Sequence, residues 1–198
     1  MSIKKELVEQ AKKAKLAARE LANASTELKN RALKGIADAL ENSFSEIMKE
    51  NEKDMKNGRD KGLSIAMLDR LELNQKRIKG MADGLRELVA LEDPIGDIIT
   101  MRKRSNGLQI GKMRVPLGVI GIIYESRPNV TIDAAGLCLK AGNAVVLRGG
   151  SEAIHSNRIL ARIAADAAQE AGLSEGVVQL IQTTDREAVK VLFELSQY

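Results

Sequence analysis

Two glycines and an arginine lie where an expected strand gives way to a helix, a composition suited to binding a phosphate. Residues 144–148 (AVVLR) are typical of a strand, and Gly149 and Gly150 would let the backbone approach a ligand closely. Ser151 can cap the following helix while its first amides point at an anion, and Arg148 adds a charge that suits a phosphate oxygen. An ordinary strand-to-helix turn also needs glycine, so this loop alone leaves both interpretations open. Neither the dinucleotide fingerprint GxGxxG nor the phosphate loop GxxxxGK[ST] occurs in the chain.

A second polar group follows the apolar run at 118–124. Glu125, Ser126 and Arg127 come directly after this expected strand. Ligands of open parallel sheets bind at the carboxyl ends of the strands, so these three side chains can orient a ligand. They can also form a plain turn, which Pro128-Asn129 favours.

The single cysteine and the single histidine are the residues that nucleophilic catalysis would need. Cys138 lies in an apolar helical stretch, AAGLCL, which is typical of a small buried side chain. His155 lies in the first turn after Ser151, where a surface or capping role is favoured. A Cys138–His155 catalytic pair is the alternative, and the spacing does not favour it. One cysteine also excludes an internal disulfide framework and a zinc site built from several cysteines, and we expect no metal.

Strands and helices alternate regularly from Pro116 onward. The expected strands are 118–124, 144–148 and 177–181, and the expected helices run from about Val130 to Gly142, from Ser151 to near Gly172, and over 185–196. The first strand is continuously apolar, which is typical of a parallel strand covered on both faces. Three β–α units in a row predict an α/β fold with a doubly wound parallel sheet.

The first part of the chain has the periodicity of helices. Apolar residues at spacings of three and four predict a helix from Ile3 to Leu21. Ser25 suits the start of a second helix that should stop near Asn57-Gly58, with a buried side made of Leu33, Ile36, Leu40, Phe44 and Ile47. A short helix is expected after Ser64 and a longer one after Asn74, before Asp93-Pro94.

Residues 98–115 have a different composition, in which β-forming and charged residues lie on both sides of Asn106-Gly107. This dipeptide suits the positive φ angles of a tight turn and predicts a long hairpin, neither arm of which is apolar enough for a core strand. The hairpin carries five cations with no acid between them: Arg102, Lys103, Arg104, Lys112 and Arg114. The favoured interpretation is an exposed arm kept soluble by charge. A nucleic-acid patch is the alternative, although no recognised binding motif accompanies it.

The composition narrows the classes of protein to which the chain can belong. The 198 residues carry 31 basic and 27 acidic side chains, and 44% of them are hydrophobic but only 2% aromatic. Base-stacking platforms and aromatic-lined sugar grooves need rings in number and are excluded. No apolar run has the length of a signal peptide core or a membrane span, so we expect a soluble cytoplasmic protein without a membrane partner.

The segments 115–131 (VPLGVIGIIYESRPNVT) and 140–157 (KAGNAVVLRGGSEAIHSN) resemble the gamma-glutamyl phosphate reductase (glutamate-5-semialdehyde dehydrogenase) family. The segments 61–64, 68–71 and 106–111 fit the same family. The resemblance implies an aldehyde-dehydrogenase-like fold with N-terminal helices, a β-hairpin arm and a cofactor sheet. It also implies an NADPH-dependent reduction of L-glutamate 5-phosphate to the semialdehyde and phosphate, which supplies proline's precursor and runs through a thioester on a cysteine.

By this resemblance, residues 124–129 would line the cofactor and active-site cleft, and Arg148 would meet the adenine ribose. Ser151 falls near the position where NAD-preferring relatives carry an acid, and a neutral serine beside Arg148 would accommodate a 2′-phosphate. The residues expected to bind NADPH are Glu125, Ser126, Arg127, Arg148, Gly149, Gly150 and Ser151. The hairpin resembles the oligomerisation arm of the family, which predicts a homo-oligomer and no nucleic-acid partner.

Members of this family are much longer than the chain, which is similar to their N-terminal portion only. By this resemblance, the chain consists of an N-terminal helical segment (1–93) that packs on the cofactor domain, the arm (94–115) and a truncated Rossmann-like NADPH-binding domain (116–198). The nucleophilic cysteine and a glycine-rich loop would belong to the catalytic part beyond it, and Cys138 does not match that cysteine. We therefore expect no catalytic residue here and no activity from this chain alone. The alternative is a non-catalytic truncated subunit or interaction module.

Overall fold

A three-stranded parallel sheet lies at the centre of the fold. In the computed structural model, which describes residues 2–198, the strand order is β3 (Val119–Ile123), β4 (Ala144–Arg148) and β5 (Val178–Leu180). The register pairs Val119 with Ala144 and Ile123 with Arg148, so the first two strands end level with each other. Helices α6 (Asn129–Lys140), α7 (Ile154–Glu170) and α8 (Glu187–Glu194) follow the three strands in turn. This confirms the predicted α/β fold.

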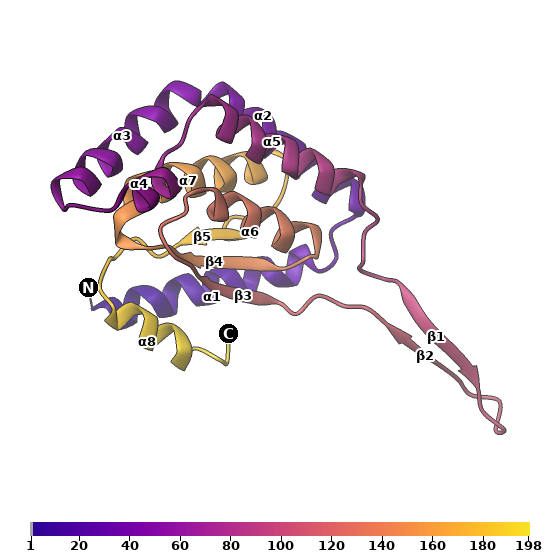
Figure 1. Ribbon diagram of the computed structural model, residues 1–198. Coiled ribbons are helices and arrows are strands. Elements are labelled where there is room, and N and C mark those ends of the chain that lie inside the picture. The colour runs from indigo at the N-terminus through magenta and orange to yellow at the C-terminus, as the bar shows by residue number, and fades with distance from the viewer. Residues whose placement is uncertain (1) are drawn as a thin grey trace.

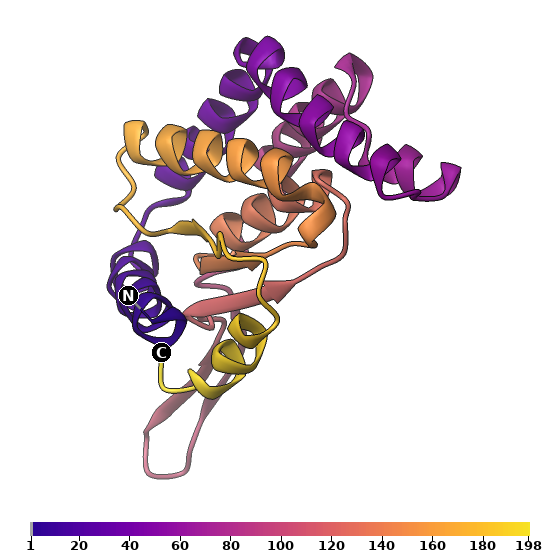
Figure 2. The same ribbon diagram turned by 90° about the vertical axis from the view of Figure 1, so that its left-hand side faces the viewer.

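Helices cover both faces of the sheet. Val145 and Leu147 of β4 belong to the main core with α6 and α7, whereas Ala144 and Val146 point the other way into a smaller core with α1 (Ile3–Leu21) and α8. Alternate residues of a strand face opposite sides, and the views in Figures 1 and 2 show α6 and α7 on one side of the sheet and α1 and α8 on the other. The arrangement agrees with a doubly wound sheet.

Strand β3 differs from its prediction. It pairs only with β4 among the described residues, and Gly121 and Ile123 are exposed. The strand covered on both faces is β4, whose residues from Ala144 to Leu147 are all buried. A continuous apolar run marks a parallel strand but does not separate a central strand from an edge strand, so the expectation of full burial for β3 was wrong.

The remaining helices form an outer layer over α6 and α7. They are α2 (Thr26–Asn42), α3 (Phe44–Asp60), α4 (Ile65–Leu71) and α5 (Gln75–Ala90) (Figure 1). Ser25, Ser64 and Asn74 each accept a hydrogen bond from a backbone amide in the first turn of the helix that follows. Such caps satisfy amides that have no partner within the helix, and they fix three of the predicted helix starts.

The single helix expected from Ser25 to Asn57-Gly58 is two helices. Ser43 has φ −97° and ψ 15°, which breaks the chain between α2 and α3. Asn42 and Ser43 are weak helix formers whose side chains compete for backbone hydrogen bonds, and the apolar stripe that continues through Ile47 concealed the break. As a result α3 packs against α7, and its Asp54 side chain lies at the start of that helix.

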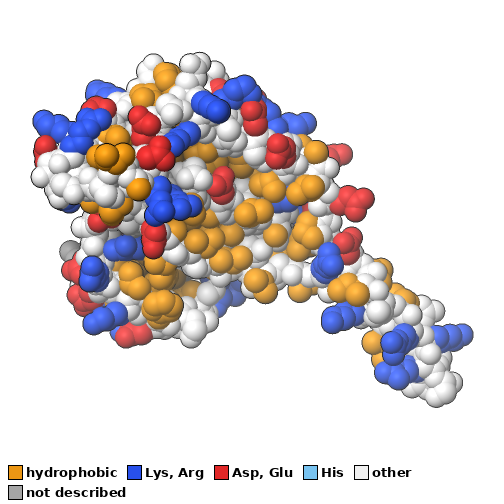
Figure 3. Space-filling view, viewed as in Figure 1, with side chains coloured by type: hydrophobic (Ala, Val, Ile, Leu, Met, Phe, Trp, Pro, Cys, Tyr) orange, Lys and Arg blue, Asp and Glu red, His pale blue; other side chains and the backbone are white. Residues whose placement is uncertain are grey.

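The predicted hairpin is confirmed. Strands β1 (Ile98–Lys103) and β2 (Gln109–Met113) pair antiparallel, and Gly107 has φ +89° in the turn between them. Every residue of both strands is exposed, and Figure 3 shows the arm projecting from the body with lysines and arginines along it. No helix among the described residues is long and apolar enough to cross a membrane.

Candidate functional site

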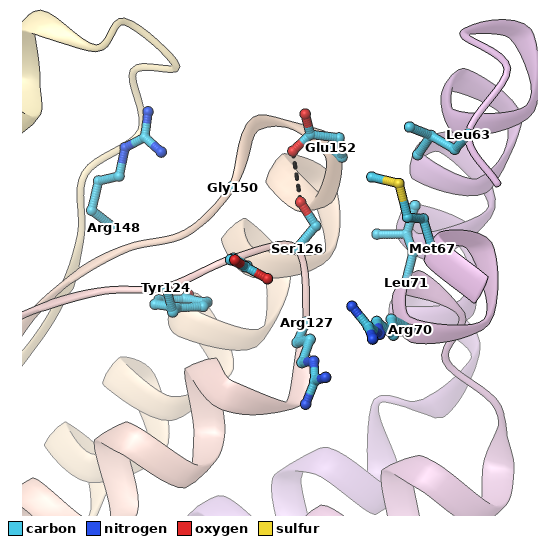
Figure 4. A pocket seen from close by; sticks show the side chains of 11 residues that line it. Leu63, Met67, Arg70, Leu71, Tyr124, Ser126, Arg127, Arg148, Gly150 and Glu152 are labelled. Atoms are coloured by element: carbon cyan, nitrogen blue, oxygen red, sulfur yellow. Dashed lines mark hydrogen bonds between the residues drawn. The ribbon is translucent and has the colours of Figure 1, made fainter.

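A cleft of about 390 Å³ lies where β3 and β4 end, against helix α4. Its walls come from α4 and the turn before it, from the segment after β3, and from the turn after β4 (Figure 4). The lining residues are Leu63, Met67, Arg70, Leu71, Tyr124, Glu125, Ser126, Arg127, Arg148, Gly150 and Glu152. The position agrees with the rule that open parallel sheets bind ligands at the carboxyl ends of their strands.

The structure brings five of the seven predicted site residues into this cleft, namely Glu125, Ser126, Arg127, Arg148 and Gly150. Gly149 and Ser151 do not line it. A Cβ on Gly149 would overlap the Asn157 amide and the Tyr124 ring, and one on Gly150 would overlap the Ser126 hydroxyl. Close packing within the protein therefore requires both glycines, which is a reason that neither interpretation of this loop from its sequence gave.

Ser151 does not cap the following helix. Its hydroxyl donates to Glu152 Oε1 at 3.0 Å, while the Ser126 hydroxyl donates to Glu152 Oε2 at 2.6 Å. The hydrogen bond from Ser126 is the main cause that holds the pKa of Glu152 below its ordinary range. The cleft therefore contains a carboxylate beside Ser151, where the sequence predicted a neutral site. Sequence reasoning missed Glu152, although it stands next to the predicted Ser151.

The N-terminus of α7 is capped by Asp54 of α3. Its Oδ2 accepts from the Ser156 amide and hydroxyl, both at 2.7 Å, and its Oδ1 accepts from the His155 amide at 3.2 Å. Burial raises the pKa of Asp54, and the hydrogen bonds from Ser156 and His155 oppose that rise. Two amides at the start of α7 thus bind an internal carboxylate in place of the expected ligand anion.

Arg148 is held by backbone carbonyls at the end of β4. Its Nη1 donates to Gly149 O at 3.1 Å and its Nη2 donates to Thr184 O at 3.2 Å. Its Nε is buried and has no partner among the described residues. Figure 4 shows Arg148 on the opposite side of the Gly150 turn from Glu152, and apart from Arg70 and Arg127. The guanidinium is therefore fixed in place with N–H groups left for a ligand.

Tyr124 forms part of the floor of the cleft through a buried hydrogen-bond chain. Its hydroxyl lies 2.7 Å from Thr131 Oγ1, and Thr131 donates to Asn157 Oδ1 at 3.1 Å. Because the Thr131 proton goes to Asn157, the Tyr124 hydroxyl is the donor in the first of these bonds. Burial raises the pKa of Tyr124 to about 12, so the ring stays neutral and the chain stays intact at neutral pH.

The cysteine and the histidine do not form a pair. Cys138 is only 5% exposed, it lies in the main core, and burial raises the pKa of its thiol to about 11. A thiolate is the reactive form of cysteine, so this side chain is poorly suited to nucleophilic attack. His155 Nδ1 lies 3.7 Å from Glu50 Oε2 on the side of α7 that faces α3. Across residues 2–198 no three His, Cys, Asp or Glu side chains are grouped to hold a metal ion.

Known proteins are similar to this chain over almost its whole length. The sequence model described as "Aldehyde dehydrogenase family" matches residues 2–197. The chain is 67% identical over 198 residues to a gamma-glutamyl phosphate reductase of Halothermothrix orenii, covering 100% of the chain and 47% of that protein. The crystal structure of a gamma-glutamyl phosphate reductase from Thermotoga maritima superposes with a TM-score of 0.96 at 42% identity, over 98% of this chain and 47% of that one.

A more distant relative has the same architecture. The crystal structure of the Saccharomyces cerevisiae gamma-glutamyl phosphate reductase gives a TM-score of 0.84 at 33% identity, over 91% of this chain and 47% of that one. The chain therefore spans about half the length of the relatives it matches. The match to the Thermotoga maritima structure covers 98% of this chain, so it includes nearly all of the arm, the outer helices and the cleft at the strand ends.

Proposed function

The chain belongs to the aldehyde dehydrogenase family, and we propose that it is the cofactor-binding part of a gamma-glutamyl phosphate reductase. The proposed reaction is the reduction of L-glutamate 5-phosphate by NADPH and a proton to L-glutamate 5-semialdehyde, NADP⁺ and phosphate, in proline biosynthesis. The observation that supports it most strongly is a 67% identity to a protein of that name over all 198 residues. We also propose that the protein acts in the cytoplasm.

The family suggests a nicotinamide cofactor, and the cleft has features that fit one. The orphaned Nε–H of Arg148 is buried at the end of β4, and the guanidinium is held by the carbonyls of Gly149 and Thr184. We assign to Arg148 the contact with the 2′-phosphate of NADPH, because a guanidinium binds phosphate oxygens well. When bound, the cofactor supplies the hydride for the reduction.

Glu152 is the feature of the cleft that a 2′-phosphate would have to avoid. Both of its carboxylate oxygens accept hydrogen bonds from serine hydroxyls, Ser126 and Ser151. Figure 4 shows it on the other side of the Gly150 turn from Arg148. We propose that Ser126 and Ser151 hold Glu152 and shape the cleft, that Gly149 and Gly150 allow the close packing of the turn, and that Glu125 contributes to the cleft wall.

We propose that residues 1–93, 94–115 and 116–198 act as a supporting helical segment, an oligomerisation arm and the cofactor domain. No residue of this chain is proposed as the nucleophile, because the thiol of Cys138 is buried and has a pKa of about 11. The isolated chain should therefore bind NADPH but not oxidise it in the presence of L-glutamate 5-phosphate. Sustained turnover by the pure 198-residue chain would overturn the assignment of the nucleophile to other polypeptide.

The exposed arm favours a second candidate function. Both strands of the hairpin are exposed along their whole length, and the arm projects from the body (Figure 3). The chain could then act as a non-catalytic subunit that docks through this arm on a longer reductase. Such a subunit would co-purify with its partner without binding NADPH, and calorimetry with the cofactor separates the two functions.

A further inference from the structure

A second cleft adjoins the first and shares two arginines with it. It encloses about 510 Å³ beside α4, α5 and the start of α6, and Arg70 and Arg127 line both clefts. Arg70 comes from α4 and Arg127 from the turn after β3. In Figure 4 their guanidinium groups lie at the same end of the first cleft, opposite the end where Arg148 lies. The boundary between the two clefts is therefore marked by positive charge.

Carboxylates line both clefts, but none of them pairs with the two shared arginines. Within residues 2–198 the guanidinium groups of Arg70 and Arg127 have no hydrogen-bond or ion-pair partner. Arg77, which lines the second cleft only, instead pairs with Asp69 at 2.9 Å and donates to Glu72 O at 2.7 Å. Arginine stays charged in proteins, so an anion that contacts both of these guanidinium groups would be attracted by two positive charges.

We propose that Arg70 and Arg127 together bind the phosphate group of the acyl phosphate substrate, at the boundary of the two clefts. This inference rests on the proposed function. In an acyl phosphate, a single oxygen joins the phosphorus to the carbonyl carbon that receives the hydride. The phosphate must therefore lie next to the cofactor cleft, and Arg70 and Arg127, which line both clefts, are placed to contact it there. Two planar guanidinium groups can also follow the phosphate as it becomes the leaving group.

The rest of the second cleft suits the amino acid end of the same substrate. Glu72 and Asp133 line this cleft but not the first, and Asp133 Oδ2 accepts from Asn129 Nδ2 at 3.0 Å. Carboxylates there can attract the α-ammonium group of a glutamyl chain. The phosphate beside the reacting carbon thus lies by the two arginines, and the α-ammonium group at the far end, which also carries the α-carboxylate, lies by Glu72 and Asp133.

Arg127 has a different role here from the one that the sequence predicts. The family resemblance grouped it with Arg148 as a cofactor residue. All three arginines line the first cleft, but only Arg127 and Arg70 also line the second. Arg70 lies on α4, far along the chain from the strand ends, so only the fold brings it to the site. The roles of Arg148 and of the Arg70–Arg127 pair can be tested separately.

The experiment measures binding to the 198-residue chain by isothermal titration calorimetry. The probes are inorganic phosphate, acetyl phosphate, L-glutamate and NADPH, and the variants are Arg70→Gln, Arg127→Gln and Arg148→Gln. Arg102→Gln, on the exposed arm, is the matched control. We expect Arg70→Gln and Arg127→Gln each to weaken acetyl phosphate binding about tenfold or more, since each removes a charge-assisted contact. Both should leave the affinity for NADPH within about twofold, and Arg102→Gln should change neither.

Three results would overturn the inference. One is a loss of acetyl phosphate binding in Arg148→Gln with none in the other two variants, which would place the phosphate at the cofactor end. Another is an equal weakening of L-glutamate binding, which would make the pair a carboxylate site. The third is a loss of NADPH binding in Arg127→Gln. A failure of the proposed function would give another result. Neither the wild-type chain nor any variant would bind NADPH, but acetyl phosphate would still bind through Arg70 and Arg127.

Discussion

The carboxylate of Asp54 lies 2.7 Å from the backbone nitrogen of Ser156 and 2.7 Å from its hydroxyl oxygen. Asn51, one helical turn earlier in α3, donates to the same Ser156 hydroxyl at 3.0 Å and accepts from the Leu73 amide at 2.9 Å. All of these polar groups are buried. The outer helices are therefore joined to the start of α7, and through it to the turn that carries Glu152, by a small polar network.

Replacement of Asp54 by asparagine tests this network. The amide side chain would keep one acceptor and lose the charge, so we expect the free energy of unfolding to fall by about 1–2 kcal/mol at pH 7, as for other lost caps. Urea unfolding measures it. Asp60→Asn, at the exposed end of the same helix, is the control and should change little.

The difference in the free energy of unfolding between the wild-type chain and Asp54→Asn should decrease as the pH rises. Burial raises the pKa of Asp54 above its ordinary value of 3.8, so the folded state binds its proton more tightly than the unfolded state. The stability that Asp54 contributes relative to asparagine is then fully present below the ordinary pKa and declines as the pH rises through the raised pKa. A difference that grows over this pH range would show that the hydrogen bonds outweigh burial.

Glu152 should show the opposite dependence. The hydroxyl of Ser126 lowers its pKa, so its contribution to stability is present above the ordinary value and is lost as the pH falls through the lowered one. Comparison of the wild-type chain with Glu152→Gln in urea, from about pH 3 to about pH 7, measures the effect. Ser126→Ala should reduce the pH dependence, and an unchanged dependence in that variant would contradict the assigned cause.

Glycine is required at position 149 by packing. A Cβ there would meet the Asn157 amide and the Tyr124 ring. Asn157 is fully buried and Tyr124 half-buried. We expect Gly149→Ala to destabilise the chain by about 1–3 kcal/mol in thermal or urea unfolding, because overpacking displaces the neighbours. Gly84→Ala is the matched control, since nothing lies near its Cβ position in α5. It should stabilise the helix by about 0.5–1 kcal/mol. Equal effects of both substitutions would contradict this account of the turn.

The arm is expected to mediate self-association. Replacing residues 98–113 with a short Gly-Ser linker should shift the chain to a monomer, as measured by light scattering. An intact chain that is already monomeric at micromolar concentration would argue against an oligomerisation arm.

The nucleic-acid alternative is tested with a variant in which Arg102, Lys103 and Arg104 are all changed to glutamine. Salt-dependent retention of duplex DNA that this triple variant loses would favour that alternative.

Much of the fold could be predicted from local patterns. The structure contains the expected helix starts after Ser25, Ser64 and Asn74, the turn at Asn106-Gly107, and the alternation of strands and helices from Pro116 onward. The break at Ser43 was missed because it interrupts the helix without interrupting the apolar stripe. The edge position of β3 was missed because strand order depends on contacts between distant segments.

The candidate site was only partly predictable for the same reason. Glu125 to Arg127 and the Arg148 turn follow strands directly, and the rule for parallel sheets places them at one edge. Arg70 and Asp54 reach the same region from the outer helices, and no local signal points to them. The cap of α7 was assigned to Ser151 from its position in the sequence. The residue that accepts the hydrogen bonds is Asp54 of α3, and nothing in the sequence shows that α3 packs against α7.

We propose that the ends of β3 and β4 form a half-site for NADPH in which Arg148 contacts the 2′-phosphate. Isothermal titration calorimetry of the wild-type chain and of Arg148→Glu with NADPH and with NADH tests it most directly. We predict saturable NADPH binding that Arg148→Glu weakens at least tenfold, with a much smaller change for NADH, which lacks that phosphate. Equal weakening of both cofactors, or no binding of NADPH to the wild-type chain, would contradict the claim.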